Sequence, residues 1–171
     1  VPEILQTAFP PALPSMRHVV INRPAHDSLY QQLEVESVII PNIFDFSRAA
    51  PGINSFSRDL RGALGLTDDH LMILQPTRVI RRKGIELSIE LVRRLAEPGC
   101  RAHLLDKEPV LVITHKAGDE GSDYLRELQE RARAAQIKMV YAATRFAPRE
   151  QWVEQNKVYS LWDAYVQSQF V

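Results

Sequence analysis

The sequence predicts an α/β fold built on a parallel β-sheet, and three observations indicate this fold. The runs 71–74 and 110–114, apolar apart from Thr114, are typical of strands buried on both faces, and residues 137–141 predict a third strand. Amphipathic segments at 85–96 and 122–135 separate these runs. The order strand, helix, strand, helix, strand is that of a parallel sheet with right-handed crossovers. With 171 residues, 45% of them hydrophobic, the chain is long enough to bury a substantial core.

The first third of the chain predicts a smaller unit of the same kind. Residues 1–16 contain four prolines and predict a loop. A short strand is expected at 17–22, a helix at 24–33 with a proline in its first turn, and a second strand at 37–40. Residues 43–54 then read as a connection between two units.

The second unit begins with a helix that we expect to run from Asn54 or Ser55 to Leu64, with Gly65 as its stop. The first buried strand leads into a polar turn at 75–84. The helix after this turn has apolar residues at helical spacing and is expected to end at Pro98-Gly99. Its predicted core positions are Ile85, Ile89, Val92 and Ala96.

The remaining segments also alternate between predicted strands and predicted helices. Ser122 is the expected N-cap of the next helix, whose apolar stripe consists of Leu125, Leu128, Ala132 and Ala135. Short helices are expected at 149–155 and 160–166, and 169–171 predicts the opening of a fourth strand. Aromatic residues on the late helices, Trp152, Tyr159, Trp162 and Tyr165, are expected to pack.

Composition excludes several classes of function. One cysteine permits neither an internal disulfide nor a cysteine-built zinc site, and the five histidines lack metal-ligand spacing. No apolar run reaches the length of about 20 residues that a membrane span needs. No signal peptide pattern opens the chain, so the cytoplasm is the default location. Neither Gly-x-Gly-x-x-Gly nor a phosphate-binding P-loop is present, which argues against a dinucleotide cofactor.

The formal net charge of zero conceals one basic window. Residues 71–100 hold six basic and three acidic side chains, whereas 1–70 hold five and eight, and 101–171 hold ten of each. A nucleic-acid binder would show a larger basic surplus, so no nucleic-acid partner is expected. Most of the window's charge comes from four residues of the 75–84 turn, namely Arg78, Arg81, Arg82 and Lys83.

The position of this turn predicts a phosphate-bearing ligand. Ligands of open parallel sheets bind beyond the carboxyl ends of the strands. The turn also precedes a helix N-terminus, where backbone N–H groups favour anions. The alternative is a solvated charged turn with no ligand. Arg81 and Arg82 are expected to face solvent, with Arg82 kept as a secondary candidate, and His115 at the end of the next strand is expected to pack.

Residues 71–86 resemble the first strand and loop of the C-terminal domain in glycosyltransferase family 4, the group 1 glycosyl transferases of GT-B fold. That family has a strand, Gly-Arg-Leu, a few residues, Lys-Gly and a helix. Arg78 matches the family arginine and Lys83 the family lysine, with Thr77 in place of the glycine. The resemblance implies that both bind the diphosphate of a nucleotide-sugar donor and stabilise the leaving nucleotide. By the same analogy Arg145 is a secondary candidate near the base.

Two further segments extend the resemblance over about residues 17–171. Residues 38–42, followed by Asp45, resemble the family's Ile-Pro-Asn-Gly-Val-Asp run, and 158–166 resemble the helix before its acidic motif. The expected division is therefore 1–47, the end of the acceptor-side Rossmann-like domain with the crossover, and 48–171, the first part of the donor-binding Rossmann-like domain. On this interpretation the chain is an internal piece of a longer enzyme and inactive alone.

The function that the resemblance implies is a retaining glycosyltransferase with a UDP- or GDP-sugar donor, an unknown acceptor, no cofactor and no metal. The alternative is a non-catalytic α/β module that binds another phosphorylated ligand at the 78–83 turn. A purely structural interaction domain is a third interpretation. An exposed sheet edge also makes a dimer conceivable.

Overall fold

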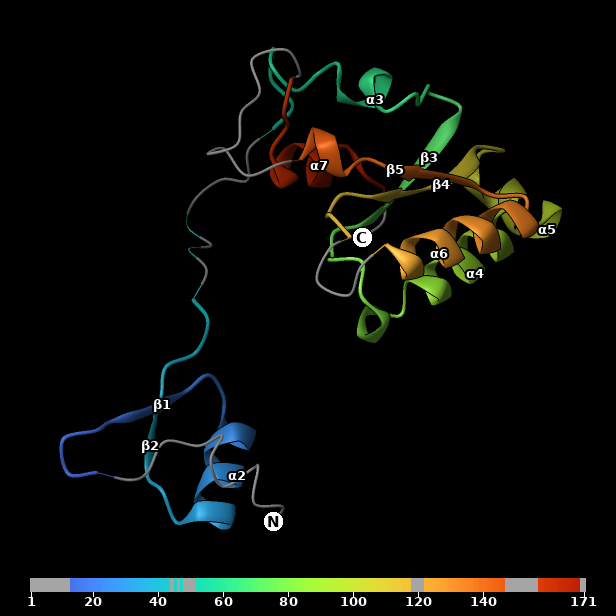
Figure 1. Cartoon of the computed structure of the whole chain (residues 1–171). Helices are drawn as coiled ribbons and strands as arrows, with labels where there is room; N and C mark the ends of the chain where they lie inside the picture. The colour runs from blue at the N-terminus through green and yellow to red at the C-terminus, as the bar shows by residue number, and fades with distance from the viewer. Residues whose placement is uncertain are drawn as a thin grey trace. The chain divides into compact units, whose positions relative to one another are not determined.

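The protein is described from a computed structural model that covers residues 13–43, 45, 47, 52–117, 122–146 and 157–169. It divides into two compact units, residues 1–49 and 50–171 (Figure 1). We describe each unit by itself. In the described parts of the chain, no helix is long and apolar enough to cross a membrane.

The first unit is a single β–α–β element. Strands β1 (His18–Val20) and β2 (Ser37–Ile39) pair in parallel, with His18 opposite Ser37, and α2 (Arg23–Leu33) connects them. Helix α2 begins after Asn22, whose side-chain oxygen accepts a hydrogen bond from the backbone N–H of Ala25 at 2.9 Å. These elements confirm the expected strand, helix and strand within one or two residues. Most of the loop expected at 1–16 lies outside the described residues.

The second unit contains a three-stranded parallel sheet in the order β3–β4–β5. Its strands are β3 (His70–Gln75), β4 (Glu108–Ile113) and β5 (Lys138–Tyr141). The register places Met72 opposite Val110 and Val112 opposite Val140. Its longer helices are α4 (Ile85–Leu95), α6 (Asp123–Ala134) and α7 (Leu161–Gln167). The parallel α/β fold predicted from the apolar runs is confirmed.

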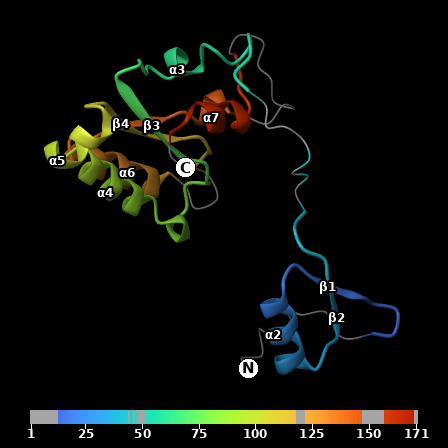
Figure 2. The ribbon, with the colours of Figure 1, turned by 180° about the vertical axis from the view of Figure 1, so that it is seen from behind.

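Helices cover both faces of this sheet, as Figures 1 and 2 show from opposite sides. On one face, Ile73, Leu111 and Ile113 pack with apolar residues of α4 and α6. On the other face, Met72 and Val112 pack against α3 (Leu60–Ala63) and α7. Because successive strand side chains point to opposite faces, the continuous apolar runs of β3 and β4 fill both cores.

The chain returns to the edge of β3 after α7. The Gln169 backbone N–H donates to the Met72 carbonyl at 3.0 Å, and the Met72 N–H donates to the Gln169 side-chain oxygen at 2.7 Å. Helix α7, which precedes Gln169, lies on one face of the sheet, whereas the crossovers from β3 to β5 use the face that α4 and α6 cover. The fourth strand expected at 169–171 lies otherwise outside the described residues.

Ala96, an expected core position of α4, is exposed. Two expected helix boundaries also need correction, and one expected helix falls beyond the described residues. The helix expected up to Leu64 is only α3, because the Asn54 side-chain oxygen accepts from the N–H groups of Phe56 and Ser57 and closes a turn instead. Pro98 does not end α4, which stops at Leu95; it opens the short helix α5 (Pro98–Arg101), as a proline can in a first turn. The helix expected at 149–155, which includes Trp152, lies outside the described residues.

The aromatic residues near the end of the chain differ in how deeply they are buried. Tyr159 is 3% exposed and packs as expected, whereas Trp162 and Tyr165 are 46% and 39% exposed and contact each other with ring centroids 5.8 Å apart. Helix α7 begins with a capping box formed by Ser160 and Asp163. Only one side of so short a helix can reach the sheet, which leaves the Trp162 and Tyr165 rings on the outer side.

Candidate functional site

The candidate site starts where β3 ends, and a short hydrogen-bond chain fixes the first residues of its loop. The Gln75 side-chain amide donates to the Thr77 hydroxyl at 2.9 Å, and the Ser88 hydroxyl donates to the Gln75 side-chain oxygen at 2.6 Å. Ser88 belongs to α4, so Gln75 links the end of the strand to the helix that follows the loop. Thr77, where the resembling family has glycine, takes part in this link.

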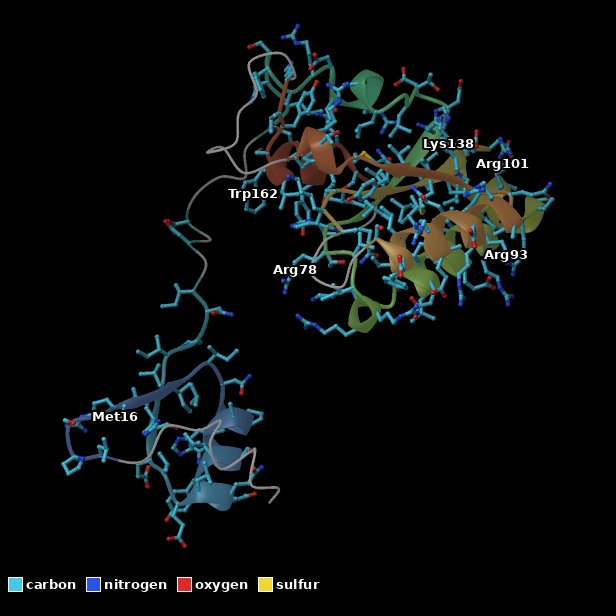
Figure 3. All side chains as sticks on the ribbon, viewed as in Figure 1. Met16, Arg78, Arg93, Arg101, Lys138 and Trp162 are labelled. Atoms are coloured by element: carbon cyan, nitrogen blue, oxygen red, sulfur yellow. The ribbon has the colours of Figure 1, made fainter. Side chains whose placement is uncertain are left out.

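The basic loop, defined here as residues 78–83, contains two buried residues between exposed ones. Val79 and Ile80 are 1% and 4% exposed, and Val79 belongs to the core between the sheet and helices α4 and α6. Arg78, Arg82 and Lys83 are exposed. Figure 3 places Arg78 at the opposite end of the sheet from Lys138, which begins β5. The exposed cations are therefore attached to a buried apolar base at the carboxyl end of β3.

A 3₁₀ turn, Arg81–Lys83, ends the basic loop and leads into α4 through Gly84. Gly84 has φ of 58°, in the left-handed region that glycine adopts without strain. Its carbonyl accepts from the Leu87 N–H at 2.9 Å and starts the helix. Lys83 thus lies two residues before Ile85, the first residue of α4, at the positive end of the helix dipole.

Side chains from the other two strand ends lie at the same edge of the sheet. His115 follows β4 and is half-buried, with its Nδ1 atom 3.0 Å from the hydroxyl of Thr114. Burial lowers the pKa of His115, and the positive charge of Arg78 lowers it further. This pairing places the end of β4 within the electrostatic reach of the basic loop. Proton loss from His115 is favoured, so the histidine adds no positive charge at neutral pH.

Arg145 lies in the 3₁₀ turn η3 (Ala143–Arg145) after β5 and is half-buried. Its carbonyl accepts from the Tyr159 N–H at 2.8 Å, which ties this strand end to the segment before α7. The pKa of Tyr159 is raised by burial and by Asp59, while the charge of Arg145 partly offsets this rise. Arg78, His115 and Arg145 therefore follow three adjacent parallel strands, as the order of the sheet requires.

Arg81 is exposed, as expected, with 66% of its side chain accessible, and it also contacts helix α6. Its guanidinium donates to a Glu127 carboxylate oxygen at 2.8 Å and lies 4.9 Å from the centre of the Tyr124 ring. Tyr124 is 4% exposed, and its hydroxyl donates to Glu86 in the first turn of α4. The expected apolar stripe omits Tyr124, although Tyr124 lies four residues before Leu128 and helical spacing could have identified it.

The contacts that link Arg81, Glu127, Tyr124 and Glu86 also shift the pKa values of the last three residues. Burial and the Glu86 carboxylate raise the pKa of Tyr124 to about 12. The hydrogen bond from Tyr124 lowers the pKa of Glu86, and Arg81 followed by Arg131 lowers the pKa of Glu127. Both carboxylates therefore stay charged near neutral pH. Across the described residues, no three His, Cys, Asp or Glu side chains gather closely enough to hold a metal ion.

Comparison with known proteins finds two relatives that share the same name. The chain is 28% identical over 179 aligned residues to a mannosylglucosylglycerate synthase of Petrotoga mobilis, covering 99% of this chain and 40% of that protein. It is 35% identical over 146 residues to a mannosylglucosylglycerate synthase of Thermotoga maritima, covering 81% of this chain and 34% of that protein. No family model and no solved structure matches the sequence. The chain thus spans well under half the length of these curated relatives, to which it is similar.

Proposed function

We propose that the chain is the donor-binding part of a glycosyltransferase that uses a nucleotide-diphosphate sugar. The observation that carries this proposal is the pair Arg78 and Lys83, exposed on a loop that Val79 and Ile80 anchor at the carboxyl end of β3. The two relatives support it, because a glycerate that carries glucosyl and mannosyl groups is assembled by sugar transfer.

The chemistry of the two cations suits this reaction. As the glycosidic bond to the donor breaks, negative charge grows on the departing diphosphate, and cations fixed in advance stabilise that charge. An arginine binds two phosphate oxygens at once, whereas a lysine acts as a point charge. In this proposal Arg78 and Lys83 bind the diphosphate, and Arg82 and Arg145 are secondary contacts. The donor is a UDP- or GDP-sugar, and transfer proceeds with retention at the anomeric carbon, both by analogy with the resembling family.

The test is a titration of the full-length protein with UDP and with GDP by calorimetry, followed by a sugar-transfer assay. Each charge-assisted hydrogen bond contributes about 1.5–3 kcal/mol, so replacing both Arg78 and Lys83 by alanine should weaken nucleotide binding at least ~10²-fold. The transfer rate should fall at least as much. The matched control is Arg93→Ala with Arg94→Ala, which removes the same charge from the last turn of α4. Unchanged affinity and turnover in the Arg78 and Lys83 variant would contradict the proposal.

The second candidate is a non-catalytic module that binds another phosphorylated ligand at the same basic loop. The exposed cations favour it equally, because they provide affinity for any phosphate group. Sugar transfer distinguishes the two functions. Nucleotide binding that depends on Arg78 and Lys83, without transfer from any UDP- or GDP-sugar, would support the binding module.

A further inference from the structure

Arg81, one of the cations of the basic loop, connects the loop to helix α6. Arg81 donates to Glu127 on α6 at 2.8 Å, and its guanidinium carbon lies 4.9 Å from the centre of the Tyr124 ring on the same helix. Glu127 also accepts from Arg131 at 2.9 Å, and Tyr124 donates to Glu86 of α4. We name Arg81, Tyr124 and Glu127 the α6 clamp.

The clamp restrains a part of the loop that the apolar base does not reach. Val79 and Ile80 anchor the first half of the loop, because their side chains are almost fully buried. The second half, Arg81–Lys83, contains no buried residue. A short 3₁₀ turn is itself only weakly stable. The contact from Arg81 to α6 therefore restrains the turn on whose last residue Lys83 lies.

The clamp also separates the roles of the loop cations. The charge of Arg81 is opposed by Glu127, whose other partner is Arg131, and the Arg81 guanidinium lies over an aromatic face. Arg82 and Lys83 follow on the same turn and are exposed. Arg81 thus contacts α6, whereas Arg82 and Lys83 are exposed on the same turn.

We propose that Arg81 is a positioning residue, which holds the 81–83 turn against Glu127 and Tyr124 so that Lys83 is preset to meet a phosphate group. This role rests on the proposed function, because it concerns the same anion site. Presetting a flexible side chain raises affinity by reducing the ordering cost of binding. Arg81 itself makes no phosphate contact.

The experiment measures the dissociation constants of UDP and GDP for the full-length protein by calorimetry, with Glu127→Gln as the decisive variant. Glutamine keeps the size of the side chain and removes a negative charge near an anion site. Electrostatics alone would then strengthen nucleotide binding. The clamp requires the opposite, a weakening of roughly two- to fivefold, since exposed ion pairs and cation–π contacts each contribute modestly. Arg81→Ala should weaken binding by a similar or larger factor, and the double variant no more than Arg81→Ala alone.

Glu90→Gln is the matched control, because Glu90 is an exposed, ion-paired glutamate of α4 whose partners are Arg93 and Arg94. It should leave both dissociation constants unchanged. The melting temperature of each variant shows that the fold is intact. Hydrogen exchange at the backbone amides of 81–84 gives a second measurement, and it should become faster in Glu127→Gln than in Glu90→Gln.

Three other outcomes would overturn the clamp. They also distinguish failure of the clamp from failure of the proposed function. Tighter binding in Glu127→Gln with weaker binding in Arg81→Ala would mean that Arg81 contacts phosphate directly. Unchanged binding in both variants, with Lys83→Ala still weakened, would reject the clamp and leave the proposed function intact. Absence of UDP and GDP binding to the unmodified protein would reject the proposed function and the clamp together.

Discussion

Tyr124→Phe is the substitution that most directly tests the network behind the basic loop. The phenyl ring fills the same volume and keeps its face toward Arg81, so only the hydroxyl and its bond to Glu86 are lost. A hydrogen bond to a charged group contributes about 1.5–3 kcal/mol. Because Glu86 is half-exposed and can regain water, we expect the lower end, about 1.5 kcal/mol. For a domain of this size that corresponds to a fall in Tm of about 6 °C.

The pH dependence of this loss follows from two pKa shifts. The raised pKa of Tyr124, about 12, stabilises the fold fully below the unfolded value of about 10 and is lost as pH rises through 12. The lowered pKa of Glu86 stabilises the fold above its ordinary value of 4.5 and is lost as pH falls through the lowered pKa. The difference between the unmodified protein and Tyr124→Phe should therefore be largest between about pH 5 and 10.

The assay is thermal unfolding of both proteins at pH values from about 3 to 11.5, a range that covers the plateau and extends into both flanks, followed by circular dichroism. Tyr165→Phe serves as the control, because Tyr165 is 39% exposed on α7 and its substitution should change stability by less than about 0.5 kcal/mol. A Tm difference below about 1 °C at neutral pH would refute the reasoning. So would a difference of the same size at neutral pH and at the alkaline end of the range.

Two further predictions concern the central strand and the strand ends. Leu111→Ala should cost about 2–5 kcal/mol in urea unfolding, because Leu111 is fully buried in β4, whereas Leu87→Ala at a 72% exposed site should cost less than about 0.5 kcal/mol. A loss below about 1 kcal/mol at Leu111 would contradict the described core. Arg78→Ala should raise the pKa of His115, measured by NMR titration of its ring protons, yet leave it below the ordinary value since burial remains. An unchanged or lower His115 pKa would show that Arg78 does not act on it.

The buried strands and helix α4 are predictable from local sequence pattern. Long apolar runs without alternation require burial on both faces, so β3 and β4 can be identified from the sequence alone. Helix α4 is equally predictable, because its buried residues Ile85, Ile89 and Val92 recur at helical spacing. The basic charge of 78–83 and its place before a helix are also visible in the sequence.

Expectations are less accurate where side-chain hydrogen bonds compete with helix formation. The sequence favours Asn54 as a helix cap, yet it closes a turn, and it favours Pro98 as a helix end, yet Pro98 begins one. Asparagine and proline fit both roles locally. Packing against the rest of the chain decides between them, and a single sequence does not contain that information.

The sequence by itself determined a parallel α/β unit with a basic loop at the carboxyl end of its first buried strand, since periodicity and charge are local properties. Only the tertiary structure decided that Arg81 of this loop contacts Glu127 and Tyr124. Arg81 and Glu127 lie 46 residues apart, and they meet because α4 and α6 pack side by side on one face of the sheet (Figure 1). The pairing of β3 with β4 brings Arg78, which follows β3, within the electrostatic reach of His115, which follows β4. Distances between side chains of different elements depend on how the helices dock, which local pattern does not specify.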